Sequence, residues 1–105
     1  MTLSRPYHPE HPEGETCRFG LDFTPVLAPG ADVSRGTLAI FTNEAVPMPA
    51  DADWTVGDIQ VDGGVVHAIL GGGRAGTDYQ LVWTAFDTEG NVFPRTALVL
   101  VAPTS

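Results

Sequence analysis

The chain has no lysine and little basic charge of any kind. Its 105 residues include only five Lys or Arg residues, all of them arginine, against 13 acidic residues, so the formal net charge at pH 7 is −8. Proteins that bind nucleic acid or anionic membrane surfaces depend on clustered basic side chains that contact phosphates. The composition therefore excludes nucleic acid and membrane from the expected partners.

Cysteine and long apolar runs are also scarce. Cys17 is the only cysteine, which excludes an internal disulfide and a thiolate metal cluster. The longest apolar run, residues 97–102, is far shorter than the ~20 residues that cross a bilayer. The N-terminus lacks the apolar stretch of a signal peptide. We therefore expect no export signal and no membrane span.

Glycine and proline, by contrast, are frequent, with 12 and nine residues. The first fifteen residues hold Pro6, Pro9 and Pro12 and few apolar side chains. Such a segment has little to pack and favours an extended, partly polyproline conformation. We predict an extended proline-rich arm over residues 1–15 and one folded domain over residues 16–105, since the length fits a single domain of roughly 100–200 residues.

Apolar residues alternate with polar ones along most of the rest of the chain. From Thr16, the side chains of Cys17, Phe19, Leu21 and Phe23 fall on one face, as in a half-buried strand. Five further runs have the lengths of strands: 37–42, 54–61, 65–70, 79–87 and 92–101. Turn signals separate them, and no segment keeps a helical period. We expect hairpin turns at Asp62-Gly63-Gly64 and at Glu89-Gly90-Asn91. The fold class expected is all-β, an immunoglobulin-like antiparallel β-sandwich of about six to seven strands with an extended N-terminal arm.

The same alternation predicts which side chains form the core. We expect them to be Phe19, Leu21, Phe23, Leu38, Ile40, Trp54, Val56, Leu81, Trp83, Leu98 and Leu100. Cys17 lies on the apolar face of its strand and is expected to be buried with them.

Groups capable of catalysis or metal binding are dispersed along the sequence. His8 and His11 are three residues apart, which in an extended arm separates them by roughly 9–10 Å, too far for two ligands of one metal. The acidic residues are scattered, and no serine lies in a Gly-x-Ser-x-Gly setting. We expect no catalytic residues, no bound metal and no cofactor. A small carbohydrate-binding module that stacks sugars on Trp54, Tyr79 or Trp83 stays open as an alternative.

Gly76-Thr77-Asp78-Tyr79 opens the penultimate predicted strand. A tyrosine at this position is typical of the tyrosine corner of immunoglobulin-like sandwiches. We predict that the Tyr79 hydroxyl ties the preceding loop back to the strand.

Several segments form one pattern along the chain: residues 72–79, Thr84, Gly90, Arg95, 97–101 and, at the opening strand, 21–24. Together they resemble a family of small tailed-phage virion proteins, the fiber-tail adaptors. The resemblance implies a non-enzymatic structural protein in the tail or neck region of the virion, made in the host cytoplasm without a signal peptide. Its partners would be other virion proteins of the tail, connector or fibre, contacted in a symmetric multi-copy assembly.

The last two predicted strands suggest where such partners bind. Both of their faces carry apolar side chains, whereas a two-layer sandwich buries only one face of each sheet. We therefore expect the second face, together with the arm, to contact another protein. The predicted interface residues are Tyr7, His8, His11, Val82, Phe86, Val99 and Val101.

The predicted core can be tested at its largest side chain. Truncation of Trp83 to Ala should lower the free energy of unfolding by about 3–5 kcal/mol, because a large cavity replaces the indole. Circular dichroism should show strand and little helix. A Trp83→Ala variant that melts like the parent protein would contradict the predicted core.

Overall fold

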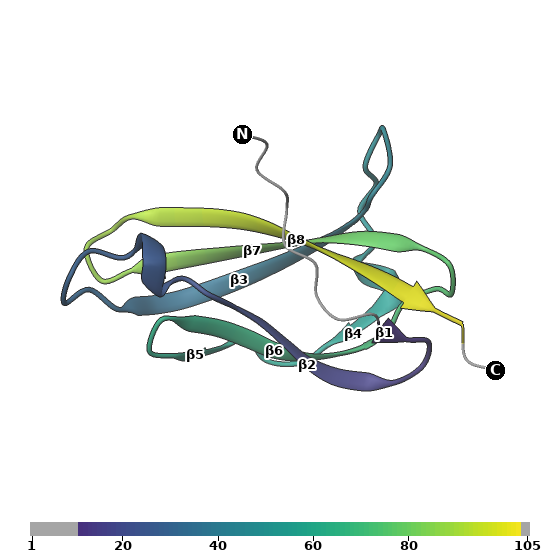
Figure 1. Ribbon diagram of the computed structural model, residues 1–105, viewed down its shortest axis with the longest axis horizontal. Helices are drawn as coiled ribbons and strands as arrows, with labels where there is room; N and C mark the ends of the chain where they lie inside the picture. Colours follow the sequence, from purple (N-terminus) through teal and green to yellow (C-terminus); the bar gives the residue numbers. More distant parts are fainter. Residues whose placement is uncertain (1–10, 104–105) are drawn as a thin grey trace.

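Two β-sheets packed face to face hold the alternating segments of the chain (Figure 1). The computed structural model describes residues 11–103. The strands are β1 (His11–Pro12), β2 (Thr16–Asp22), β3 (Val33–Thr42), β4 (Trp54–Val56), β5 (Gln60–Asp62), β6 (Val65–Gly72), β7 (Asp78–Asp87) and β8 (Val92–Ala102). Two short 3-10 helices, η1 (Thr24–Val26) and η2 (Asp51–Asp53), lie in the connections. No helix within this range is long and apolar enough to cross a membrane.

The strand order is that of an immunoglobulin-like sandwich. One sheet runs β1-β8-β7-β3, and the other runs β2-β6-β4 with β5 also paired to β6. All pairs are antiparallel except β1 with β8. The all-β sandwich predicted from the alternation is confirmed. The run 54–61, expected as one strand, is divided into β4 and β5, which pair with different parts of β6.

Both hairpin turns predicted from the sequence are present. Asp62 pairs with Val65 across a two-residue turn whose first residue, Gly63, has φ +62. At the β7–β8 turn, the Asp87 carboxylate accepts hydrogen bonds from the Asn91 side-chain amide (2.9 Å) and the backbone N–H groups of Asn91 and Glu89 (2.7 and 2.9 Å). The hydrogen bond from the Asn91 side chain is the main reason that the pKa of Asp87 lies below its ordinary value.

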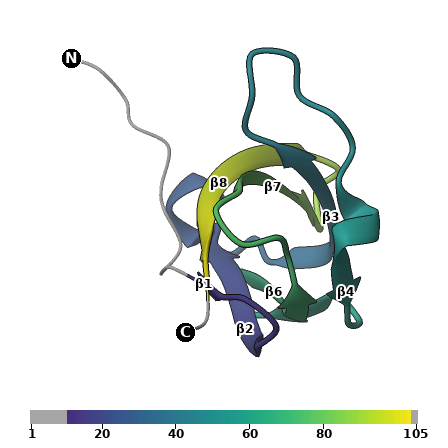
Figure 2. The same cartoon turned by 90° about the vertical axis from the view of Figure 1, so that its right-hand side faces the viewer.

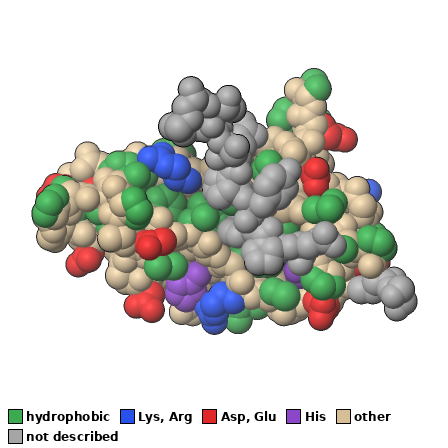
Figure 3. All heavy atoms as spheres, in the orientation of Figure 1, with side chains coloured by type: hydrophobic (Ala, Val, Ile, Leu, Met, Phe, Trp, Pro, Cys, Tyr) green, Lys and Arg blue, Asp and Glu red, His purple; other side chains and the backbone are tan. Residues whose placement is uncertain are grey.

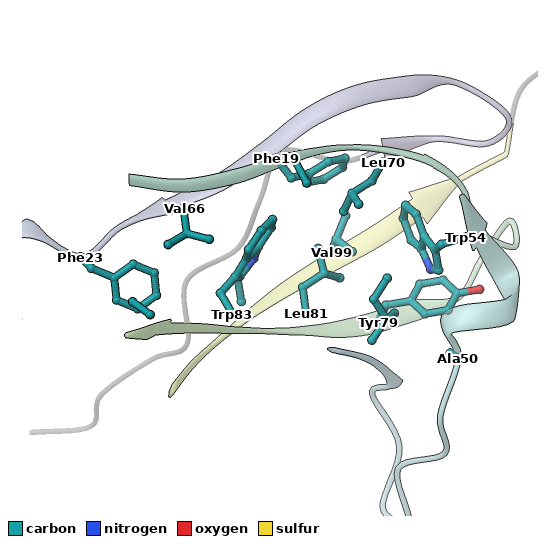
Figure 4. Packing of buried hydrophobic residues seen from close by; sticks show 14 of the residues in the cluster. Phe19, Phe23, Ala50, Trp54, Val66, Leu70, Tyr79, Leu81, Trp83 and Val99 are labelled. Carbon is teal, nitrogen blue, oxygen red and sulfur yellow. The ribbon is translucent and has the colours of Figure 1, made fainter. Parts of the chain in front are cut away.

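The core lies between the sheets and centres on the inward side chains of β7 (Figure 4). Tyr79, Leu81 and Trp83 are all fully buried. Of the other predicted core residues, Phe19, Phe23, Ile40 and Trp54 are buried, and Leu21 and Leu38 are partly buried. Leu98 is also buried, but it lies opposite Gln80 on the outer side of its sheet and outside the core cluster. Two predictions are wrong, because Val56 and Leu100 are 42% and 37% exposed.

The face of β8 that points into the core is the opposite of the one predicted. Val99 pairs with Tyr79 and therefore points to the same, inner side of the sheet. Val99 and Val101 are 0% exposed, so they are core residues of this chain and not the partner contacts that the sequence suggested. Apolar residues occupy both faces of β8, so alternation alone did not distinguish them; the register with β7 does.

The expected arm reaches into the sandwich at its C-terminal end. His11 and Pro12 pair in parallel with Val101 and Ala102 of β8 (Figure 2). The His11 side chain is 1% exposed, with its ring centroid 5.4 Å from that of Phe19 and 5.2 Å from that of Trp54. The prediction of an arm outside the sandwich is thus wrong for these two residues. The proline-rich segment is extended, so its backbone can pair with β8, and the His11 imidazole packs against the aromatic rings of Phe19 and Trp54.

The buried imidazole gives a test of this correction. Neither ring nitrogen of His11 has a hydrogen-bond partner in the described part of the chain, so the ring contributes by packing. His11→Ala should lower the free energy of unfolding by about 2–5 kcal/mol, the range for large-to-Ala changes in cores. His11→Leu should cost less than about 1.5 kcal/mol, because it keeps volume and removes two unpartnered polar atoms. Equal stability of the wild type and the His11→Ala variant in urea would contradict the packing role.

Candidate protein-binding surfaces

The outward side of the β7–β8 pair carries several apolar side chains. Val82 and Phe86 alternate with the buried residues of β7 and are half-buried on the outer side. Phe86 pairs with Val92, which is 53% exposed, and the Arg35 guanidinium lies 3.7 Å from the centroid of the Phe86 ring. Together with Leu100, the residues Val82, Phe86 and Val92 form what we term the outer apolar face. Exposed apolar surface of this kind is typical of sites that contact other proteins.

The predicted interface residues fall into three groups in the structure. Tyr7 and His8 lie outside the described residues. His11, Val99 and Val101 are buried within the sandwich and offer no surface to a partner. Val82 and Phe86 lie on the outer apolar face, where their predicted role as contacts stays a prediction.

The Tyr79 hydroxyl joins the β6–β7 loop to η2 at one end of the sandwich, which we term the loop-bearing end. It accepts the backbone N–H of Arg74 at 2.9 Å, as a tyrosine corner requires, and donates to the Asp53 carboxylate at 3.0 Å. Burial raises the pKa of Tyr79 above its ordinary value, with Asp53 adding to the effect, so the hydroxyl keeps its proton. The Arg74 guanidinium also lies 3.2 Å from Asp53. The predicted tie between loop and strand is therefore present, and it extends to η2.

The glycine-rich loop at this end is built for close packing. The backbone N–H of Gly73 donates to the Asp53 carbonyl at 2.8 Å. A Cβ at Gly73 would lie 2.6 Å from Val101 and 3.0 Å from Trp54, and its φ of +84 also favours glycine. Gly76 N–H donates to the Val101 carbonyl at 2.7 Å. The loop thus fastens η2 and the end of β8 together.

The aromatic rings considered for sugar stacking are not on the surface. Trp54 is 7% exposed, and Tyr79 and Trp83 are 0% exposed. The carbohydrate-binding alternative needs at least one of these rings to be accessible, so no observation favours it. Cys17, expected to be buried, is exposed at the edge of β2. No group of three metal-ligating side chains occurs among residues 11–103.

A projecting loop between β3 and η2 is a surface that the sequence analysis treated only as a connection. Residues 43–49, which we term the finger, extend away from the sandwich and end in hydrophobic side chains (Figure 2, Figure 3). Val46 is 74% exposed and Met48 is 56% exposed, the two highest values among the exposed large hydrophobic residues. The signal in the sequence was an apolar run, Ala45 to Pro49, without strand alternation in a strongly acidic protein.

An apolar groove lies between β2, η1 and β8. Its volume is about 260 Å³, and the residues that line it are Leu21, Asp22, Phe23, Pro25, Val26, Arg95 and Thr96. No local sequence pattern predicts this groove, because its lining comes from two segments about 70 residues apart that only the packing of the two sheets brings together.

Comparison with known proteins gives one family match. The model of a family described as podophage GP4 fiber-tail adaptor protein gp77 matches residues 12–100. The matched range runs from the second residue of β1 to Leu100, near the end of β8, and includes the tyrosine corner. No curated protein matches the chain.

The Tyr79 hydroxyl can be tested without disturbing the ring. Tyr79→Phe removes one acceptor and one donor and leaves Arg74 N–H and Asp53 short of a partner, so the free energy of unfolding should fall by about 1–3 kcal/mol. The matched control is Asp51→Ala, which removes an exposed carboxylate from η2, the helix that also contains Asp53. This variant should change stability little. Identical denaturation midpoints for Tyr79→Phe and Asp51→Ala would contradict the role given to the hydroxyl.

Proposed function

We propose that this chain, a member of the podophage fiber-tail adaptor family, is a non-enzymatic structural protein that joins tail or connector components to fibres through protein–protein contacts. The observation that carries the proposal is the family match over residues 12–100, which covers nearly the whole sandwich. The family's description as an adaptor supports a position at the tail of the virion and partners among tail and fibre proteins.

The polar groups at the loop-bearing end support a structural role. The Tyr79 hydroxyl, the Asp53 carboxylate and the backbone of the 71–77 loop bind one another. These interactions fix loops in place, which a subunit needs if it presents a constant surface to its neighbours. The polar groups of this end thus hold the loops in position.

The apolar side chains on the surface support binding by contact. The outer apolar face and the finger both expose hydrophobic atoms in a protein whose net charge is −8. Such patches are covered in stable assemblies. We infer that the protein occurs in several symmetry-related copies, with Val82 and Phe86 among the residues covered by another virion protein.

The test is made on assembled phage particles. Particles produced without this protein should lack fibres and adsorb to cells at least tenfold more slowly, measured by electron microscopy and adsorption rate. Complementation with a Val82→Glu, Phe86→Glu variant should restore fibres poorly, because two charges would be buried in the contact.

Two controls make this result specific. Thr55→Glu places a charge on an exposed residue of β4 in the other sheet and should restore fibres fully. The isolated variants should keep the melting temperature of the wild type within a few degrees. Normally fibred particles in the complete absence of the protein would refute the proposed function.

A further inference from the structure

The finger and the apolar groove lie toward opposite ends of the molecule. In Figure 1 the finger rises at the right, where β3 ends, whereas η1 lies at the left. Pro25 and Val26 of η1 line the groove. The finger offers exposed Val46 and Met48, and the groove offers an apolar lining that includes Val26. One chain thus carries a projecting apolar loop and an apolar groove that are too far apart to contact each other within the same molecule.

Hydrogen bonds anchor the base of the finger. Thr42 N–H donates to the Met48 carbonyl at 2.9 Å, and Met48 N–H donates to the Thr42 hydroxyl at 3.0 Å. Asn43 N–H donates to the Asp78 carbonyl at 3.0 Å, and Ala50 N–H donates to the Ile40 carbonyl at 2.9 Å. A loop that is already ordered loses little entropy when its tip binds a partner.

The groove has the size for side chains. Its volume of about 260 Å³ lies below the ~300–1,000 Å³ of small-molecule sites. It is bounded by one rim from β2 and η1 and by another from Arg95 and Thr96 of β8. One or two apolar side chains would replace water there and gain the free energy of apolar burial.

Charges beside the two features are complementary. Glu44 lies at the base of the finger, next to Thr42, whose hydroxyl donates to it at 3.0 Å. Arg95 is exposed at the rim of the groove, where its guanidinium donates to the carbonyl of the neighbouring Pro94 at 2.7 Å. Asp22 lies on the opposite rim, so with the tip of a finger in the groove the acidic base would meet a basic group on the β8 side, at Arg95.

We propose that the finger of one copy of this chain inserts into the groove of a second copy, with Val46 and Met48 against Val26 and with Glu44 facing Arg95. The contact is heterologous, because the two surfaces differ, so repetition produces a ring when the rotation closes. This inference rests on the proposed function, in which several copies surround the tail. It identifies the surfaces through which neighbouring copies bind.

A single contact of this kind is small. Stable protein–protein interfaces bury about 1,200–2,000 Å², more than one loop tip covers, so two isolated copies should associate weakly. Closure of a ring makes each contact intramolecular and strengthens the whole assembly. The experiment therefore traps the contact covalently.

Disulfide trapping between two variants tests the geometry. In a Cys17→Ser background, one protein carries Val26→Cys and the other carries Met48→Cys. A disulfide needs Cα atoms within about 7 Å, which the contact supplies between copies and the separation of the two sites prevents within one chain. Mixing the two proteins under mild oxidation should give the mixed dimer at least tenfold faster than a mixture of Met48→Cys with Thr55→Cys. Equal rates for the two mixtures would overturn the proposal.

Charge reversal tests the pairing independently of packing. In the trapping pair, Glu44→Arg on the Met48→Cys protein or Arg95→Glu on the Val26→Cys protein should each slow formation of the mixed dimer severalfold, and the two together should restore the rate. Unchanged rates in all combinations would overturn the assigned contact between Glu44 and Arg95.

Trapping in assembled particles separates this inference from the proposed function. A chain with Cys17→Ser and both new cysteines should give a ladder of cross-linked copies. A finger cysteine that cross-links only to a fibre or tail protein would refute the contact between copies and leave the adaptor function standing. Particles that carry fibres without this protein would instead refute the adaptor function.

Discussion

The Tyr79 hydroxyl fixes one end of the sandwich, because it binds the loop before β7 on one side and η2 on the other. Its ring lies edge-on to Trp54 with centroids 5.2 Å apart, so the same residue also holds the first strand after η2. Once η2 is placed, Ala50 pairs with Ile40 of β3 and sets where the finger leaves the sheet. One buried phenol thus links two connections, the β6–β7 loop and the β3–β4 segment that includes η2 and the finger.

The aromatic cluster around Trp54 extends this order to the start of the described chain. His11 packs between Phe19 and Trp54 while its backbone pairs with Val101 of β8. The short parallel strand thus packs the His11 ring against Trp54 at this end of the sandwich.

A fold fastened in this way suits an adaptor. Its core is formed by the inner faces of β6, β7 and β8, and its loops are joined to one another by backbone hydrogen bonds. The outer apolar face lies on β7 and β8, the groove is lined by residues of β2, η1 and β8, and the finger is anchored at its base by hydrogen bonds. Surfaces that are already ordered lose less entropy on binding.

The sequence by itself determined the fold class, the two hairpin turns, most of the core and the tyrosine corner. These follow from local signals: alternation of side chains, Gly-Gly and Gly-Asn turns, and a tyrosine at the start of a strand. Only the tertiary structure decided which face of β8 is inside, because both faces are apolar and the register with β7 makes the choice. It also decided the burial of His11 and the existence of the groove, since each depends on contacts between segments far apart in the chain, which no local pattern encodes.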